Sequence, residues 1–291
     1  MRAAFAEIVD YAGLFPPASC TMADAARQYD VYRRSTERWM LGRFVVAAIR
    51  LQELGEAIDA GGIVIDVRDP WRLSVAMGAV VPAELARIAA FQAAWEPRGV
   101  LADSIEYRVA SVGQVLALGE QIPHLFRRYF EVPQVGPYRD IVGAIGQVGA
   151  FAKVRTGGMS PERFPAATEL TRFLLAVVKH GVPFKATAGL HHPFRGHYPI
   201  SYAHDAERQV MYGFVNLLLA TAELQRGGEG EVAQAILEEG DRSAILRDGD
   251  GITWRDQRYS YAELTAAHQR LFIGFGSCSF REPVDELGVA A

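Results

Sequence analysis

Short runs of β-branched and aromatic residues alternate along the chain with longer segments in which apolar residues recur at helical spacing. The clearest helical segment lies between residues 157 and 183, where Thr168 is the expected N-cap and Gly181 the expected end. The run at 244–247 is the weakest strand signal. The pattern predicts eight strands, at 43–48, 72–78, 104–110, 128–133, 150–157, 184–191, 244–247 and 272–277.

This alternation predicts a parallel sheet, because strands that are apolar along nearly their whole length are typical of sheets covered on both faces. Eight strand–helix units favour a single α/β domain over residues 1–291, a (β/α)8 barrel of the TIM type. We expect residues 1–40 to form an N-terminal extension of a loop and a helix, and residues 227–262 to hold a small insertion with a hairpin. The alternative is an open doubly wound sheet, although the chain has no G-x-G-x-x-G motif after a first strand.

Composition and charge narrow the possible partners. Half of the residues are hydrophobic, the formal net charge is −4, and the basic residues are scattered, so we expect neither nucleic acid nor a membrane as partner. The two cysteines lie far apart in the sequence and suit a reducing compartment. The sequence therefore predicts a cytoplasmic protein, and it leaves a homo-oligomer open.

Lysine is rare in this chain. It has 27 arginines and only three lysines, and lysine, unlike arginine, can lose its proton. Lys179 ends a predicted helix, where any cation is favourable. Lys153 and Lys185 lie instead inside the fifth and sixth predicted strands. By the two-residue period of a strand, both point into the barrel, where the active site of this fold opens at the carboxyl ends of the strands.

The same period directs Glu106, Arg108 and Glu131 toward the two lysines. Two ammonium groups about 6 Å apart at an effective dielectric near 20 repel by roughly 2 to 3 kcal/mol, which is about two pKa units. Burial acts in the same direction and the glutamates oppose it. We expect one neutral amine, the form that attacks a carbonyl. A static ion network is the alternative interpretation.

Two motifs carry a resemblance to a known family. KVRTGG at 153–158 and KATAGL at 185–190 resemble class I aldolases of the deoxyribose-phosphate aldolase type in pattern and separation. The resemblance implies that Lys153 forms the Schiff base and that Lys185 lowers its pKa. Arg155, where the family prefers a small residue, and LHHP at 190–193 depart from the family pattern. The whole chain also looks like a group of uncharacterised bacterial proteins, which implies no substrate.

Two histidines follow the sixth predicted strand. Neighbouring residues on a strand face opposite sides, so we expect at most one of His191 and His192 to meet a ligand. His191 is our candidate proton shuttle, and a loop histidine bonded to the backbone is the alternative. Together with Glu106 and Glu131, His191 is also the alternative ligand set for a divalent metal, although no specific spacing supports it.

The turn GSCSF at 276–280 follows the last predicted strand, where barrels commonly bind phosphate. Ser277 and Ser279 are the candidates for holding an anion, and Cys278 is either a nucleophile or a packed thiol. Arg155 and Arg195 are candidate partners of a carboxylate or phosphate. The remaining candidate substrate contacts are Thr156, Thr187 and His192.

These observations predict an enzyme of the class I aldolase or lyase type without a cofactor. Its expected partner is a small anionic carbonyl compound or a phosphorylated substrate. Protons would move through Glu106, Glu131 or His191. One alternative is a divalent-metal-dependent lyase, isomerase or hydrolase on the same fold. A second is a barrel that binds a metabolite without turning it over.

Overall fold

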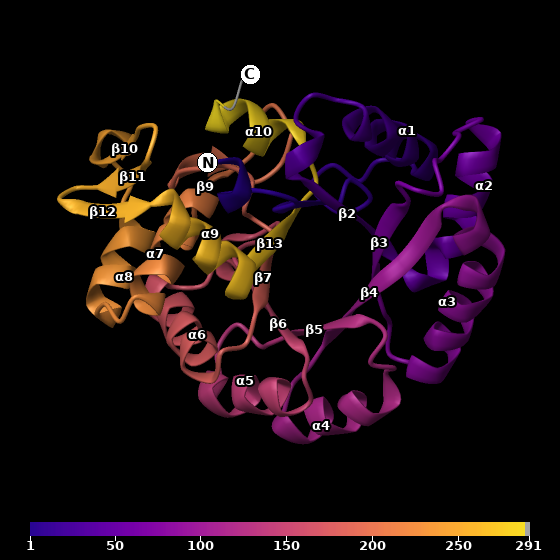
Figure 1. Cartoon of the computed structure of the whole chain (residues 1–291), viewed down its shortest axis with the longest axis horizontal. Helices are drawn as coiled ribbons and strands as arrows, with labels where there is room; N and C mark the ends of the chain where they lie inside the picture. Colours follow the sequence, from indigo (N-terminus) through magenta and orange to yellow (C-terminus); the bar gives the residue numbers. More distant parts are fainter. Residues whose placement is uncertain (289–291) are drawn as a thin grey trace.

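Eight parallel strands close into a barrel, and helices surround it on the outside (Figure 1). The structure is a computed structural model and describes residues 1–288. The order around the barrel is β1-β13-β7-β6-β5-β4-β3-β2, which confirms the predicted (β/α)8 fold. The barrel strands are β1 (Val9–Tyr11), β2 (Leu41–Ala47), β3 (Trp71–Ala76), β4 (Val100–Arg108), β5 (Arg127–Glu131), β6 (Phe151–Arg155), β7 (Phe184–Thr187) and β13 (Phe272–Ser277).

Helix α6 shows how the apolar pattern positions the outer layer. It buries Phe173, Leu174 and Val177 and ends at Gly181, whose φ of 61° favours glycine. Its N-cap is Ala166 and not the predicted Thr168, because the backbone is already helical from Ala167 onward. The helices are α1 (Met22–Arg33), α2 (Leu51–Ala60), α3 (Val81–Trp95), α4 (Val112–Gln121), α5 (Tyr138–Gln147), α6 (Ala167–His180), α7 (Phe214–Gln225), α8 (Gly230–Glu238), α9 (Tyr261–Arg270) and α10 (Arg281–Leu287).

The first barrel strand lies where the sequence predicts a loop. Residues 9–11 form β1 between β13 and β2, so residues 1–40 make up the first strand–helix unit and are not an extension. The predicted strand at 244–247 is wrong as a barrel strand. It becomes β10 (Ile245–Arg247) in an antiparallel sheet with β11 (Gly251–Trp254) and β12 (Gln257–Ser260), within the predicted insertion. The two segments differ in burial: all of β1 is buried, whereas β10 exposes two of its three residues.

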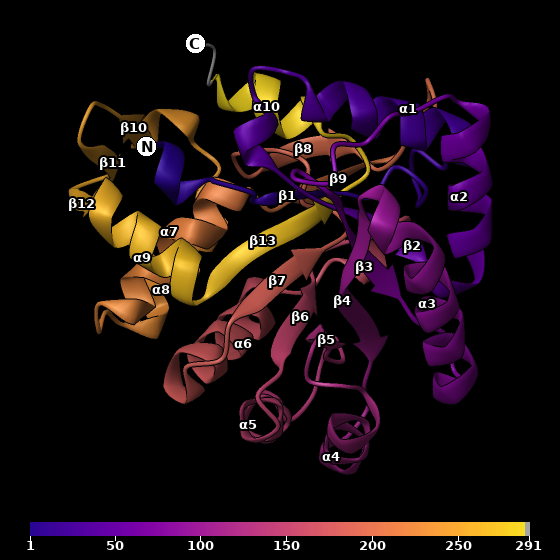
Figure 2. The ribbon, with the colours of Figure 1, turned by 45° about the vertical axis from the view of Figure 1, so that its right-hand side comes forward.

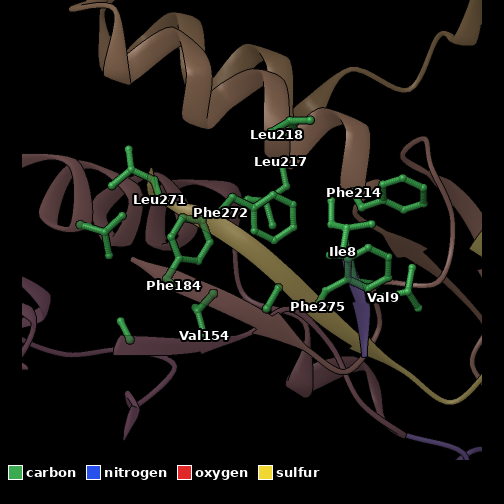
Figure 3. Packing of buried hydrophobic residues seen from close by; sticks show 14 of the residues in the cluster. Ile8, Val9, Val154, Phe184, Phe214, Leu217, Leu218, Leu271, Phe272 and Phe275 are labelled. Carbon is green, nitrogen blue, oxygen red and sulfur yellow. The ribbon is translucent and has the colours of Figure 1, made fainter. Parts of the chain in front are cut away.

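The apolar core lies between the barrel and its helices. Phe184 of β7 stacks on Phe272 of β13 with ring centroids 5.3 Å apart, and Phe275 stacks on Phe214 of α7 at 5.0 Å. Figure 3 shows these rings beneath Leu217 and Leu218 of α7. Burial of each such side chain contributes roughly 1.5 to 3 kcal/mol. Because side chains alternate along a strand, this outward packing directs the residue after Phe184 into the barrel.

The carboxyl ends of the strands meet under a cover of loops. A hairpin of β8 (Gly196–Pro199) and β9 (Arg208–Met211), together with α10, lies at the end to which the strand arrows point (Figure 2). The sequence does not predict this hairpin. Among the described residues, no helix combines the length and apolar character needed to cross a membrane.

Candidate active site

A cavity of about 850 Å³ opens at the carboxyl ends of the barrel strands. Its wall includes Glu106 of β4, Glu131 of β5, Lys153 of β6 and Lys185 of β7, each on a neighbouring strand. The structure thus brings together the four charged residues that the sequence singles out. All four are buried, and they stand where this fold holds its active sites.

Strand register sets the order of these side chains. Lys185 pairs with Lys153 across β7 and β6, and Lys153 pairs with Glu131 across β6 and β5. Residues in register on parallel strands point to the same side, so all three side chains enter the barrel at one level. Glu106 reaches the group from β4 and contacts both lysines, each with a different carboxylate oxygen.

Lys185 has the more enclosed position of the two lysines. Its side chain is 2% exposed, and its Nζ lies 2.7 Å from Oδ2 of Asp10 and in contact with Glu106. The ring of Tyr129 lies below the same nitrogen, with its centroid 4.8 Å away. Burial lowers the pKa of Lys185, but Asp10 and Glu106 together raise it above its ordinary value. Lys185 is therefore charged at neutral pH and is not the neutral amine that the sequence leads us to expect.

Lys153 has no carboxylate of its own. Its Nζ lies 2.8 Å from Glu106 and 2.8 Å from Glu131, yet Glu106 also pairs with Lys185. Glu131 is shared in the same way, because Arg155 approaches it at 3.1 Å and Arg108 at 3.4 Å. If Lys153 lost its proton, every carboxylate in the group would keep a cationic partner. If Lys185 lost its proton, the carboxylate on β1 would lose its ammonium partner.

Both glutamates are held as carboxylates. Burial raises the pKa of Glu106, but the charges of Lys153 and Lys185 lower it well below its usual range. The pKa of Glu131 is lowered against burial as well, chiefly by Lys153 and then by Arg155. The hydroxyl of Ser74 also donates to Glu106 at 2.6 Å. The group is therefore a fully ionised network with its polar atoms paired.

Sequence reasoning places Asp10 in a loop that either covers the pocket or caps the floor of the barrel, and it misses Asp10 as the partner of Lys185. The residue lies on β1, and its Oδ1 accepts the backbone N–H of Arg43 at 2.7 Å while Oδ2 accepts from Lys185. It therefore joins the first strand both to β2 and to the centre of the barrel. The available signal was the apolar pair before it, Ile8 and Val9, but a strand of three residues is too short for its periodicity to be read.

The two lysine motifs also meet through their glycines. Gly189 has a φ of +70°, and a Cβ built on it would lie 2.7 Å from the Cα of Gly157. Backbone from the loops after β6 and β7 thus approaches so closely that no side chain fits between. The glycines of KVRTGG and KATAGL thus allow the two loops that follow the lysine strands to lie this close together.

Of the other predicted contacts, several reach the cavity. Arg155 is fixed by Glu131, and His192 is held at 2.8 Å by Glu286 of α10. Burial lowers the pKa of His192 against the effect of that carboxylate. The predicted residues in the cavity wall, beyond the lysines and glutamates, are Arg155, Thr187, His191, His192 and Cys278.

Four predicted contacts lie outside this wall. Thr156 is buried and donates to the carbonyl of Ala188 at 2.6 Å, so its role is structural. The backbone N–H of Arg195 donates to Asn216 at 3.0 Å, and its guanidinium lies beside Gly240. The hydroxyl of Ser277 accepts the backbone N–H of Ser279 at 3.3 Å, and the hydroxyl of Ser279 accepts that of Glu282 in α10 at 3.2 Å. These hydroxyls join the end of β13 to the first turn of α10.

The alternative metal ligands are not assembled. Among residues 1–288, no group of three or more His, Cys, Asp or Glu side chains has an arrangement suited to a metal ion. Glu106 and Glu131 face lysines, whereas His191 contacts Ser277 at 3.2 Å and Glu282 at 3.4 Å.

Comparison with protein-family models finds no match, and no curated protein matches the chain in sequence. The likeness to deoxyribose-phosphate aldolases therefore rests on the two lysine motifs alone.

Proposed function

We propose that this chain is an enzyme in which Lys153 forms a Schiff base with a small carbonyl compound, as a class I aldolase or related lyase. The observation that carries the proposal is the sharing of carboxylates around Lys153. Its amine borders the cavity, and both of its carboxylates have other cationic partners. It can therefore become neutral without leaving a buried charge uncompensated, which is the requirement for a nucleophilic lysine.

In the proposed reaction, Glu131 or Glu106, each 2.8 Å from the Lys153 nitrogen, relays the Lys153 proton and ends the step as a carboxylate again. The free electron pair attacks the carbonyl carbon, and the carbonyl oxygen leaves as water after taking up two protons, one from the attacking nitrogen and one returned through the glutamate. The resulting iminium draws electrons from the adjacent carbon, so that a C–C bond to that carbon can break or form. Lys185 stays charged throughout and holds Glu106 in place.

The substrate class follows from the cavity wall. Arg108, Arg155 and Arg163 line it, which favours a small carbonyl compound that carries a carboxylate or phosphate. The chemistry proposed for Lys153 requires no cofactor. Both cysteines are free thiols, and we propose the cytoplasm, a reducing compartment, as the location of the protein.

Borohydride trapping tests this proposal. The protein is incubated with a panel of small aldehydes and keto acids, reduced with borohydride, and digested for mass mapping. With only three lysines, each can be followed separately. We expect a saturable adduct on Lys153, because it is the lysine in the cavity wall whose two carboxylates both have other cationic partners.

Lys179 supplies the control. It is exposed in the last turn of α6, so it reports non-specific reductive alkylation. Lys153→Arg keeps the charge and should abolish the specific adduct, whereas Lys179→Arg should leave it unchanged. An adduct that forms on Lys185 instead, or on all three lysines equally, would contradict the proposal.

A further inference from the structure

Cys278 lies in the same cavity with a histidine partner that the proposed Schiff-base reaction does not use. The residue follows β13 in the turn before α10, and its side chain is 5% exposed. Its Sγ lies 3.8 Å from Nδ1 of His191 and 3.5 Å from the hydroxyl of Tyr202. The thiol thus has two hydrogen-bond partners from different loops, one after β7 and one between β8 and β9.

Charges around the pair favour the ionised form of both groups. Burial lowers the pKa of His191, but its hydrogen bonds to Cys278 and Glu282 raise it to about 9. Burial raises the pKa of Cys278, yet the hydrogen bond and charge of His191, followed by Tyr202 and the Ala18 backbone, bring it below its ordinary value. A thiolate beside an imidazolium is the reactive form of cysteine.

The other titratable groups that face the pair leave this charge state intact. Tyr202 and Tyr11 have raised pKa values, chiefly because of burial, so both stay neutral. His192 has a lowered pKa and adds no positive charge at neutral pH. Glu282 is an anion that lies 3.4 Å from Nδ1 of His191, and it stabilises the imidazolium.

We propose that Cys278 and His191 form a second covalent site in the cavity, which captures an aldehyde as a reversible hemithioacetal. The thiolate electron pair forms the S–C bond, the π electrons of the carbonyl move to its oxygen, and that oxygen takes the proton of His191. No oxidant, reductant or leaving group is needed. The site goes beyond the Schiff base on Lys153 and does not depend on it.

Alkylation by iodoacetamide tests the ion pair. The whole protein is labelled between about pH 5 and pH 10, and both cysteines are followed by mass mapping. Cys20 is the control, because it is the more exposed of the two and no histidine of residues 1–288 is hydrogen-bonded to it. We expect Cys278 to react at least about ten-fold faster than Cys20 at pH 7, with a midpoint clearly below the ordinary thiol value of about 8.5.

Two variants test whether Cys278 reacts because it is paired with His191 or only because it is accessible. His191→Asn removes the imidazolium and should raise the midpoint of Cys278 by about one pH unit or more, since one pKa unit is a ten-fold change in thiolate at fixed pH. Tyr202→Phe removes only a hydrogen-bond donor on an exposed loop residue and should raise it by less. Equal midpoints in the parent and both variants would overturn the thiolate–imidazolium pair.

The aldehyde is tested with acetaldehyde in the Lys153→Arg variant, where no adduct on Lys153 can interfere. Acetaldehyde should protect Cys278 from iodoacetamide in a concentration-dependent way, and dialysis should reverse the protection. Cys20 should be unaffected. A reactive Cys278 that acetaldehyde fails to protect would refute the aldehyde site. The trapping experiment measures an adduct on Lys153, whereas this experiment measures labelling of Cys278. A negative result in one therefore does not contradict the proposal tested by the other.

Discussion

Replacing Glu106 with glutamine should remove the one carboxylate that both buried lysines share. The substitution keeps the shape of the side chain and the hydrogen bond to Ser74, but it removes contacts with two ammonium groups, one of them at 2.8 Å. Because Glu106 is only 4% exposed, water cannot take its place. Loss of one partner from a buried ion pair costs about 3 to 5 kcal/mol, so the free energy of unfolding should fall by that amount at pH 7.

The dependence of this loss on pH distinguishes charge from packing. In the variant, the two ammonium groups repel with less compensation, and a cost of about 3 kcal/mol corresponds to about two pKa units on one of them. The destabilisation should therefore shrink as the pH rises toward about 10, where that lysine also loses its proton in the unfolded chain. It should shrink at acid pH as well, because the contribution of Glu106 to the parent protein is lost as the pH falls from the unfolded value of about 4.3 toward its lowered folded pKa.

Urea unfolding at several pH values measures both effects, with Glu53→Gln as the matched control. Glu53 pairs with Arg50 at 2.7 Å, but its side chain is 47% exposed, so its loss should cost at most about 1 kcal/mol. If Glu106→Gln costs no more than this control, or if its cost does not change with pH, the reasoning from shared buried charge is wrong.

Two further predictions concern acid stability and the loop glycines. The lysines lower the pKa values of Glu106 and Glu131. The stability that these two carboxylates contribute is therefore present above the unfolded pKa of about 4.3 and should be lost as the pH falls through their folded pKa values. Acid-induced unfolding followed by circular dichroism measures this loss. Gly189→Ala forces a Cβ against Gly157 at a φ of +70° and should destabilise the protein by about 1 to 3 kcal/mol, with reduced trapping on Lys153. Gly227→Ala, also at positive φ but with open space around it, is the control, and an equal loss in both variants would show that backbone conformation alone is responsible.

Much of the fold is predictable because its signals are local. Strands such as β6 and β7 are short apolar runs between well-marked helices, and the spacing of the units identifies the barrel. The strand β1 escapes this reasoning because it has only three residues and owes its structure to neighbours distant in sequence, β2 and β13. The exposed strand β10 has a similar local sequence pattern but pairs with no barrel strand. Local pattern alone therefore predicts a barrel strand at 244–247 and none at 9–11, the reverse of what the structure has.

The site is predictable where strand periodicity applies and not beyond it. Period two and parallel register place Lys153, Lys185 and Glu131 on the inner face, and the structure agrees. The carboxylate that keeps Lys185 charged is Asp10, a contact across 175 residues of sequence, and no local pattern reveals it. The partners of Cys278 are hidden for the same reason, because His191 and Tyr202 reach it from loops whose course depends on the closed barrel.

The same ion network can be explained as scaffold or as catalytic apparatus, and the scarcity of lysine helps to separate the two. A static network needs only charge, and this chain supplies charge elsewhere with arginine, as in the buried pair of Arg43 and Asp103 at 2.6 Å. At Lys153 it uses instead a cation that can lose its proton, in the wall of a cavity and between two carboxylates that keep other partners. Charge alone does not explain that choice, since arginine would bind the same carboxylates more rigidly. The proton loss proposed for Lys153 would account for both the residue type and the shared carboxylates.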